Sequence, residues 1–182
     1  MKQLFWVVLF AVMMLAAILA LSHLTEKIVG GNVQTPPGFQ KVIKVDDGDT
    51  IEVSSGHGKV RVRMMGVDTP ETVDPRRPVQ CFGKEASAYT KQSLRGQVVR
   101  LESDSLAGDK DKYGRLLRYV YLPDGTLYNQ RLIAEGYAHE YTYQNQHYDR
   151  QTELKQAERE AQQKQRGLWS PTACNGNTKQ PA

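Results

Sequence analysis

The sequence predicts an α+β domain built on a small, closed or nearly closed β-barrel with helices packed outside it. Five segments have strand character, three further segments have helical spacing, and Asp-Gly and Gly-rich turns separate them. Strands in two groups with interleaved helices favour such a barrel. On this pattern alone, an OB-like barrel is one of several α+β arrangements.

The predicted strands combine β-branched residues with alternating polarity, which is typical of half-buried strands. They cover residues 39–45, 49–53, 59–67, 97–104 and 115–123. The predicted helices carry apolar residues at three- and four-residue spacing. They cover residues 82–96, 126–138 and 148–169.

The N-terminus differs from the rest of the chain. Residues 4–21 form an unbroken apolar run after Met1-Lys2-Gln3, and Ala20 and Ser22 offer a small-residue cleavage site. This pattern predicts a signal peptide over residues 1–22 and export as a secreted or periplasmic protein. The run also reaches the length of about 18 residues needed for a membrane anchor facing outside the cytoplasm.

A polar stretch rich in Gly and Pro, residues 23–38, is predicted to be a linker. The folded domain is expected over residues 39–170, followed by a tail over residues 171–182. The two cysteines of an exported chain favour a disulfide between Cys81 and Cys174, and the alternative is two unpaired thiols. The net charge of +4 is compatible with a polyanionic partner and does not identify one.

Three short stretches concentrate charge beside strands, and each has a simple structural interpretation. Asp47-Gly48-Asp49-Thr50 has the composition of a hairpin turn, and the segment around Asp68 has that of a capped turn. The stretch 111–115, which ends in Arg115, is compatible with a turn that carries a solvated arginine. The neighbouring Arg76 and Arg77 are expected on a solvated loop.

Together, the same stretches contain the groups needed to cleave a phosphodiester. Asp49 and Asp68 offer the hard oxygen ligands that Ca²⁺ prefers. Arg63 and Arg115 offer planar, forked donors for a phosphate. Glu71 could orient or deprotonate a water molecule. The remaining candidates, expected to contact a terminal phosphate, are Lys112 and Tyr113.

The order VIKVDDGDT, RVRMMGVDTPET, FGKEASAYTK, DKYGR, LIAEGYA and RGLW resembles the staphylococcal nuclease family over residues 40–169. The resemblance implies a five-stranded OB barrel with three helices. It also implies Ca²⁺-dependent cleavage of DNA and RNA with little base specificity and with 3′-phosphate products. We expect a monomer without an obligate protein partner. The alternative is a non-catalytic OB-type module that binds nucleic acid or protein.

The resemblance also assigns roles to individual residues. It implies that Asp49 and Asp68 bind the metal with their carboxylates and that Thr69 binds it with its carbonyl. Asp47 would lie beside the metal without binding it, and Asp46 would face solvent. The implied catalytic residues are Arg63, Glu71 and Arg115. The implied nucleotide contacts are Lys112, Tyr113 and a tyrosine of the pocket that corresponds to Tyr141 or Tyr143.

Overall fold

The computed structural model describes residues 13–16, 35–56 and 58–182. The chain divides into two units, Met1–Gln34 and Thr35–Ala182. In the first unit, the described residues 13–16 are helical and exposed. The remainder of the predicted signal or anchor segment lies outside the described residues, as does the linker up to residue 34. Among the residues that the structure does describe, no helix has the length and apolar character needed to span a membrane.

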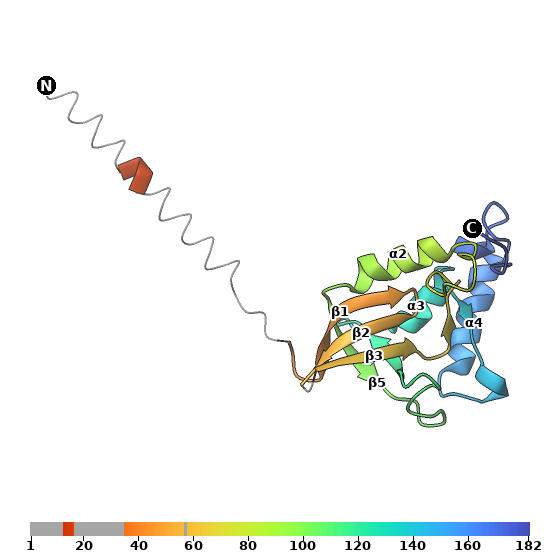
Figure 1. The fold of residues 1–182 in the computed structure, drawn as a ribbon, viewed down its shortest axis with the longest axis horizontal. Coiled ribbons are helices and arrows are strands. Elements are labelled where there is room, and N and C mark those ends of the chain that lie inside the picture. Colours follow the sequence, from red (N-terminus) through yellow and green to blue (C-terminus); the bar gives the residue numbers. More distant parts are fainter. Residues whose placement is uncertain (1–12, 17–34, 57) are drawn as a thin grey trace, which may run out of the picture. The chain divides into compact units, whose positions relative to one another are not determined.

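The predicted barrel is confirmed. Five strands close on themselves in the order β1-β2-β3-β6-β5 (Figure 1). Their bounds are β1 Phe39–Asp47, β2 Thr50–Ser55, β3 Gly58–Met64, β5 Val98–Glu102 and β6 Leu116–Tyr121. Neighbouring strands are antiparallel except for β3 and β6, and β1 closes the barrel by pairing with β5.

Alternation of side chains produces the barrel core. Val42, Ile51, Val53 and Val62 are fully buried, while polar neighbours on the same strands point outward. Leu94, Leu132, Ile133 and Leu154 extend the core from the barrel into the helices. The core is therefore continuous, and the helices are held to the barrel by apolar burial.

Three α-helices accompany the barrel: α2 Gly83–Leu94, α3 Tyr128–Ala134 and α4 Gln151–Gln163 (Figure 1). All three are shorter than predicted, α2 by only a few residues at its ends. Helix α3 stops before Gly136, whose φ is 76°, and α4 is followed by a separate 3-10 helix, η2 Gly167–Trp169. Gly136 and Gly167 lie with their backbones in direct contact, where a Cβ on either would overlap the other segment. This close approach follows directly on the end of α3, whereas α4 ends earlier, at Gln163, before Gln165 takes a left-handed φ of 50°.

The predicted strand over residues 59–67 is divided. Strand β3 ends at Met64, the chain turns at Gly66 with a φ of 70°, and β4 Val67–Asp68 pairs with β7 His139–Glu140. A Cβ at Gly66 would lie 2.8 Å from the Tyr148 hydroxyl, so the turn packs tightly against neighbouring side chains. A second 3-10 helix, η1 Tyr143–Asn145, follows β7.

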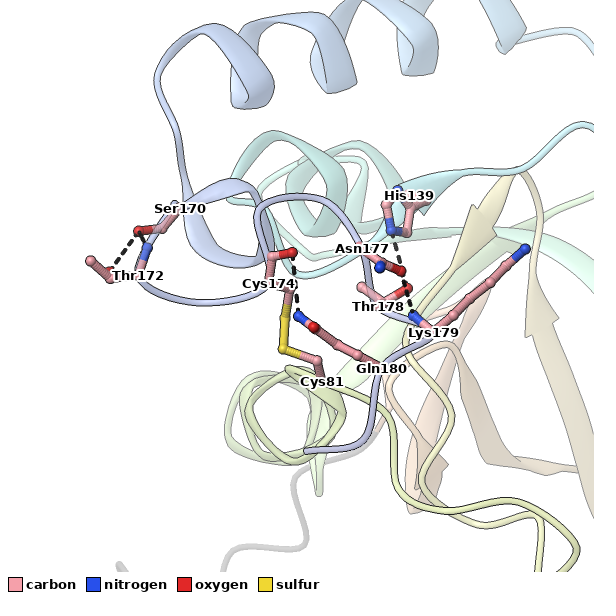
Figure 2. The surroundings of a disulfide bond; sticks show 9 residues. All are labelled: Cys81, His139, Ser170, Thr172, Cys174, Asn177, Thr178, Lys179 and Gln180. Carbon is pink, nitrogen blue, oxygen red and sulfur yellow. Dashed lines mark hydrogen bonds between the residues drawn. A yellow bond between two sulfur atoms is a disulfide. The ribbon is translucent and has the colours of Figure 1, made fainter.

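The C-terminal tail is attached to the domain. Cys174 forms a disulfide with Cys81, with 6.0 Å between the Cα atoms (Figure 2). Cys81 lies just before α2, so this bond joins two segments that are 93 residues apart in the sequence.

Asn129 on α3 holds the irregular end of β3 to β6. Its buried side chain accepts a 2.8 Å hydrogen bond from the Val120 amide. It also donates hydrogen bonds to the carbonyls of Met65 (2.8 Å) and Arg118 (3.3 Å). No sequence pattern singled out this residue, because its partners come from distant segments.

We expect Asn129→Ala to lower the free energy of unfolding by about 2–4 kcal/mol, since it leaves buried backbone groups without partners. Urea unfolding measures this change. The matched control is Asn177→Ala, which removes an exposed 3.3 Å hydrogen bond to the Lys179 amide. Equal stability of the two variants would contradict the assigned role.

Candidate functional site

A groove of about 910 Å³ runs beside β3, β4 and the loop before β6. Most of the residues predicted to act on a substrate line it. These are Arg63, Asp68, Glu71, Lys112, Tyr113, Arg115, Tyr141 and Tyr143. Asp47, Asp49 and Thr69 are buried. The structure therefore brings together side chains that are spread over almost 100 residues of sequence.

The carboxylate of Asp49 is almost fully buried and is surrounded by donors. One oxygen accepts hydrogen bonds from the amide (3.0 Å) and the hydroxyl (3.1 Å) of Thr69. The other accepts a 2.9 Å hydrogen bond from the Thr50 hydroxyl and forms an ion pair with Arg63. Burial of a carboxylate is tolerable only with such compensation.

Arg63 connects the two predicted metal-binding carboxylates. One of its terminal nitrogens pairs with Asp49, and the other lies 2.9 Å from an oxygen of Asp68 and 3.0 Å from the Val67 carbonyl. The Arg63 side chain is about four-fifths buried, and these partners fix the orientation of its planar guanidinium. Alternation on β3 places Arg63 opposite Thr50 of β2.

Arg115 is not a solvated arginine. Its Nε lies 2.6 Å from one oxygen of Asp111, and the other oxygen of Asp111 accepts hydrogen bonds from the amides of Arg115 (3.0 Å) and Tyr113 (2.9 Å). One terminal nitrogen of Arg115 donates to the Thr50 hydroxyl at 3.3 Å. Thr50 therefore joins Arg115 to Asp49.

Sequence reasoning did not assign roles to Asp111 and Thr50. The i,i+4 spacing of Asp111 and Arg115 was an available signal, because a tight turn closed by Gly114, with a φ of 78°, brings the two side chains together. No comparable signal existed for Thr50, whose contact with Arg115 spans 65 residues.

Two further carboxylates lie close enough to Asp49 to interact with it electrostatically. Burial, together with the charges of Asp49 and Glu71, raises the pKa of Asp47 to about 6, although Thr72 donates a 2.6 Å hydrogen bond to it. Partial desolvation raises the pKa of Asp68, although half of its side chain is exposed; Arg63 opposes this shift and the charge of Asp49 adds to it. The site thus gathers the carboxylates of Asp47, Asp49 and Asp68, of which Arg63 pairs with the last two.

This donor set fits a hard divalent cation with few protein ligands. Within residues 13–16, 35–56 and 58–182, no three His, Cys, Asp or Glu side chains are placed to hold a metal by themselves. A cation at Asp49 and Asp68 would therefore depend on neutral oxygens and water for its other ligands, which Ca²⁺ and Mg²⁺ accept. Thr69, next to Asp68 and in contact with Asp49, is placed to supply one such oxygen.

Glu71 lies at the edge of the groove on the loop that follows β4. One oxygen of its carboxylate accepts hydrogen bonds from the amides of Val73 (2.7 Å) and Asp74 (3.1 Å). These bonds fix the carboxylate relative to its own loop. The position of the loop backbone consequently decides where the carboxylate stands in the groove.

The outer part of the groove is aromatic and basic. Tyr113 is 70% exposed, with Lys112 and Arg115 respectively 5.1 Å and 5.3 Å from its ring centre. On another side, Tyr141 and Tyr143 are partly exposed, with their rings 6.4 Å apart. Exposed aromatic faces beside cationic groups suit stacking of flat ligand groups near phosphates.

The expectation that Asp46 faces solvent is wrong. Its side chain is 10% exposed and lies 2.6 Å from Lys44 and 2.7 Å from Arg61. The reason is that the Arg61 side chain on β3 reaches past β2 to the end of β1. Arg76 and Arg77 are exposed, as expected, and Arg76 pairs with Asp74 at 2.8 Å.

The fold and the groove define an OB-fold barrel with three helices and a site that combines paired arginines with clustered carboxylates. The family described as "Staphylococcal nuclease homologue" matches residues 61–171. The chain belongs to this family, and the resemblance noted from the sequence motifs is confirmed.

Individual relatives agree with this assignment. The chain is 47% identical to the thermonuclease of Staphylococcus hyicus over 130 residues, which cover 71% of this chain and 75% of the relative. It is 48% identical to the thermonuclease of Staphylococcus intermedius over 129 residues, covering 70% and 74%. It is also 41% identical over 127 residues to the SPbeta prophage-derived endonuclease YokF of Bacillus subtilis, covering 68% and 41%.

Gly48 allows Thr69 to approach the turn between β1 and β2. A Cβ at this position would lie 2.7 Å from the Thr69 hydroxyl and methyl groups. We expect Gly48→Ala to lower the free energy of unfolding by about 1–3 kcal/mol, because Thr69 must then move away from Asp49. Chemical denaturation measures this effect.

The control is Gly56→Ala, since a Cβ at Gly56 meets nothing within 4 Å. We expect it to change stability by less than about 0.5 kcal/mol. If both glycine variants were equally stable, the contact between Gly48 and Thr69 would not constrain the site.

Proposed function

We propose that this protein is an exported, Ca²⁺-dependent nuclease that hydrolyses DNA and RNA with little base specificity. The observation that supports this proposal most directly is the series of contacts from Arg63 through Asp49 and Thr50 to Arg115. It holds two guanidinium groups at one groove, which is the arrangement needed to bind a phosphate and stabilise its transition state. Membership of the nuclease family supports the same conclusion.

In the proposed reaction, a water molecule attacks phosphorus and the bond from phosphorus to the 5′-oxygen breaks. Glu71 orients the water and accepts its proton, and the leaving 5′-oxygen takes a proton from solvent. The products are a 3′-phosphate and a 5′-hydroxyl. Arg63 and Arg115 hold the negative charge that develops on the phosphoryl oxygens.

Asp49, Asp68 and Thr69 would hold the cation. Ca²⁺, when bound, supplies positive charge beside the scissile phosphate. Asp47 adds negative charge beside these ligands, and its bond from Thr72 keeps the Glu71 loop close to them. A bound cation would account for the closeness of the Asp47, Asp49 and Asp68 carboxylates, because it relieves their mutual repulsion.

Low base specificity follows from the character of the groove. Its charged groups suit phosphates, and Tyr113, Tyr141 and Tyr143 offer stacking faces that accept any base. The disulfide supports a location outside the cytoplasm, either free or tethered through residues 4–21. We propose that the protein acts as a monomer without an obligate protein partner.

We expect the purified protein to digest plasmid DNA and RNA in Ca²⁺ and to lose this activity in a chelator, because the carboxylate site then lacks its cation. Gel electrophoresis and end-group analysis measure cleavage and the 3′-phosphate. Folded protein that binds nucleic acid without cutting it, from neutral to alkaline pH, would instead indicate the non-catalytic binding module.

We expect Arg63→Lys and Arg115→Lys each to lower kcat/KM by a factor on the order of 10² or more. A lysine supplies one point charge and cannot reproduce the fork that spans two partners. Steady-state kinetics measure the loss. The control Arg159→Lys changes an exposed arginine on α4 that bonds to Gln156, away from the groove. Near-normal turnover of either site variant would contradict the assigned roles.

A further inference from the structure

Gln80 forms hydrogen bonds with both backbone groups of Glu71, its amide and its carbonyl. The amide of Glu71 donates a 2.8 Å hydrogen bond to the side-chain oxygen of Gln80. The amide of Gln80 donates a 3.0 Å hydrogen bond to the carbonyl of Glu71. The backbone of Glu71, from which its carboxylate projects, is therefore bonded through both its amide and its carbonyl to one partly buried residue nine positions away.

The C-terminal tail lies on the other side of Gln80. The amide of Cys81 donates to the Gln180 carbonyl, and the amide of Ala182 donates to the Val79 carbonyl, both at 2.9 Å. Gln80 and Pro181 form an antiparallel bridge. Both bonds of this pairing use Gln180 and Ala182, so the missing N–H of Pro181 removes none of them. Glu71, Gln80 and Pro181 thus lie in three adjacent backbone segments.

The tail is anchored before it reaches Gln80. The disulfide to Cys81 fixes Cys174, and the Gln180 side chain lies 3.5 Å from the Cys174 carbonyl (Figure 2). Thr178 is 3.4 Å from a ring nitrogen of His139 (Figure 2). Gly176, with a φ of 77°, packs against the Trp169 ring, where a Cβ would come within 2.6 Å. These contacts give the tail a defined path along the segment 79–81.

The other side of the Glu71 loop is also held. Thr72 bonds to Asp47, and the start of α2 presses on the loop at Gly83, where a Cβ would lie 3.2 Å from the Glu71 carbonyl. A glycine at this point lets Gln80 and Glu71 approach closely. The backbone of Glu71 consequently has contacts toward the barrel, toward α2 and, through Gln80, toward the tail.

We propose that Gln80 is a positioning residue for Glu71, and that the disulfide-anchored tail holds Gln80 in place. This inference rests on the proposed function, in which Glu71 accepts the proton of the attacking water. Gln80 does not line the groove and acts only through Glu71. A loss of position of about 1 Å at a catalytic group can lower the rate by a factor on the order of 10².

The first test compares Gln80→Ala with wild type and with Gln156→Ala, which removes an amide side chain on α4. We expect kcat for DNA cleavage to fall about tenfold to a hundredfold in Gln80→Ala while KM changes less than about twofold. We expect KM to stay nearly unchanged because Arg63 and Arg115 still bind the phosphate. Gln156→Ala is expected to match wild type, and thermal unfolding shows whether each variant is folded.

A second variant covers the case in which Gln80→Ala does not fold. The double variant Cys81→Ser and Cys174→Ser leaves Gln80 unchanged and removes only the disulfide, which is the covalent anchor of the tail. We expect a smaller fall in kcat, about threefold to tenfold, with KM retained, because the backbone bonds between tail and segment 79–81 remain. Unchanged kcat would overturn the part of the proposal that concerns the tail.

The deciding measurement is a double-mutant cycle between Gln80→Ala and Glu71→Gln. If Gln80 acts through Glu71, Gln80→Ala lowers kcat in the wild-type background and changes it less than about twofold in the Glu71→Gln background. A general structural role would cost the same factor in both backgrounds. An additive cycle in an active enzyme would therefore overturn this inference alone, whereas a folded, inactive wild type would overturn the proposed function as well.

Discussion

The burial of the Asp49 carboxylate is the constraint on which the rest of the site depends. A buried charge must be compensated, and Asp49 is compensated by four donors from three residues: Thr50, Arg63 and Thr69. Each donor comes with a structural consequence. Thr50 continues the turn into β2, Arg63 points from β3 into the groove, and Thr69 brings the loop after β4 against the barrel.

The same compensation links the two arginines. The Thr50 hydroxyl donates a hydrogen bond to Asp49 and accepts one from Arg115. This one hydroxyl therefore connects the start of β2 to the arginine that precedes β6. Asp111 holds the opposite side of Arg115. Both guanidinium groups are thus oriented before any ligand arrives, which is the condition under which fixed charges stabilise a transition state well. The loop that carries Glu71 is held differently, by backbone hydrogen bonds to Gln80 and by the bond that the Thr72 hydroxyl donates to Asp47.

Much of this architecture could be predicted from short-range patterns. Alternating β-branched residues identified the five strands, and helical spacing identified the three helices, since both periodicities follow from local backbone geometry. The element ends were less predictable. Helix α3 ends beside the contact between Gly136 and Gly167, and β3 ends at a turn packed against Tyr148. These limits are tertiary contacts between segments that no local pattern connects.

Local patterns of the chain were enough to show which kinds of residue were available: carboxylates in a turn, arginines on alternating strand positions, a tyrosine-rich segment and two cysteines. The sequence motifs were also sufficient to indicate the family. The tertiary structure then set how these groups are used. It paired Asp46 with Arg61, inserted Thr50 between Asp49 and Arg115, and laid the tail along Gln80. Such contacts depend on the closure of the barrel and on the path of the tail, because hydrogen bonds and ion pairs act over a few ångströms while their partners lie many residues apart.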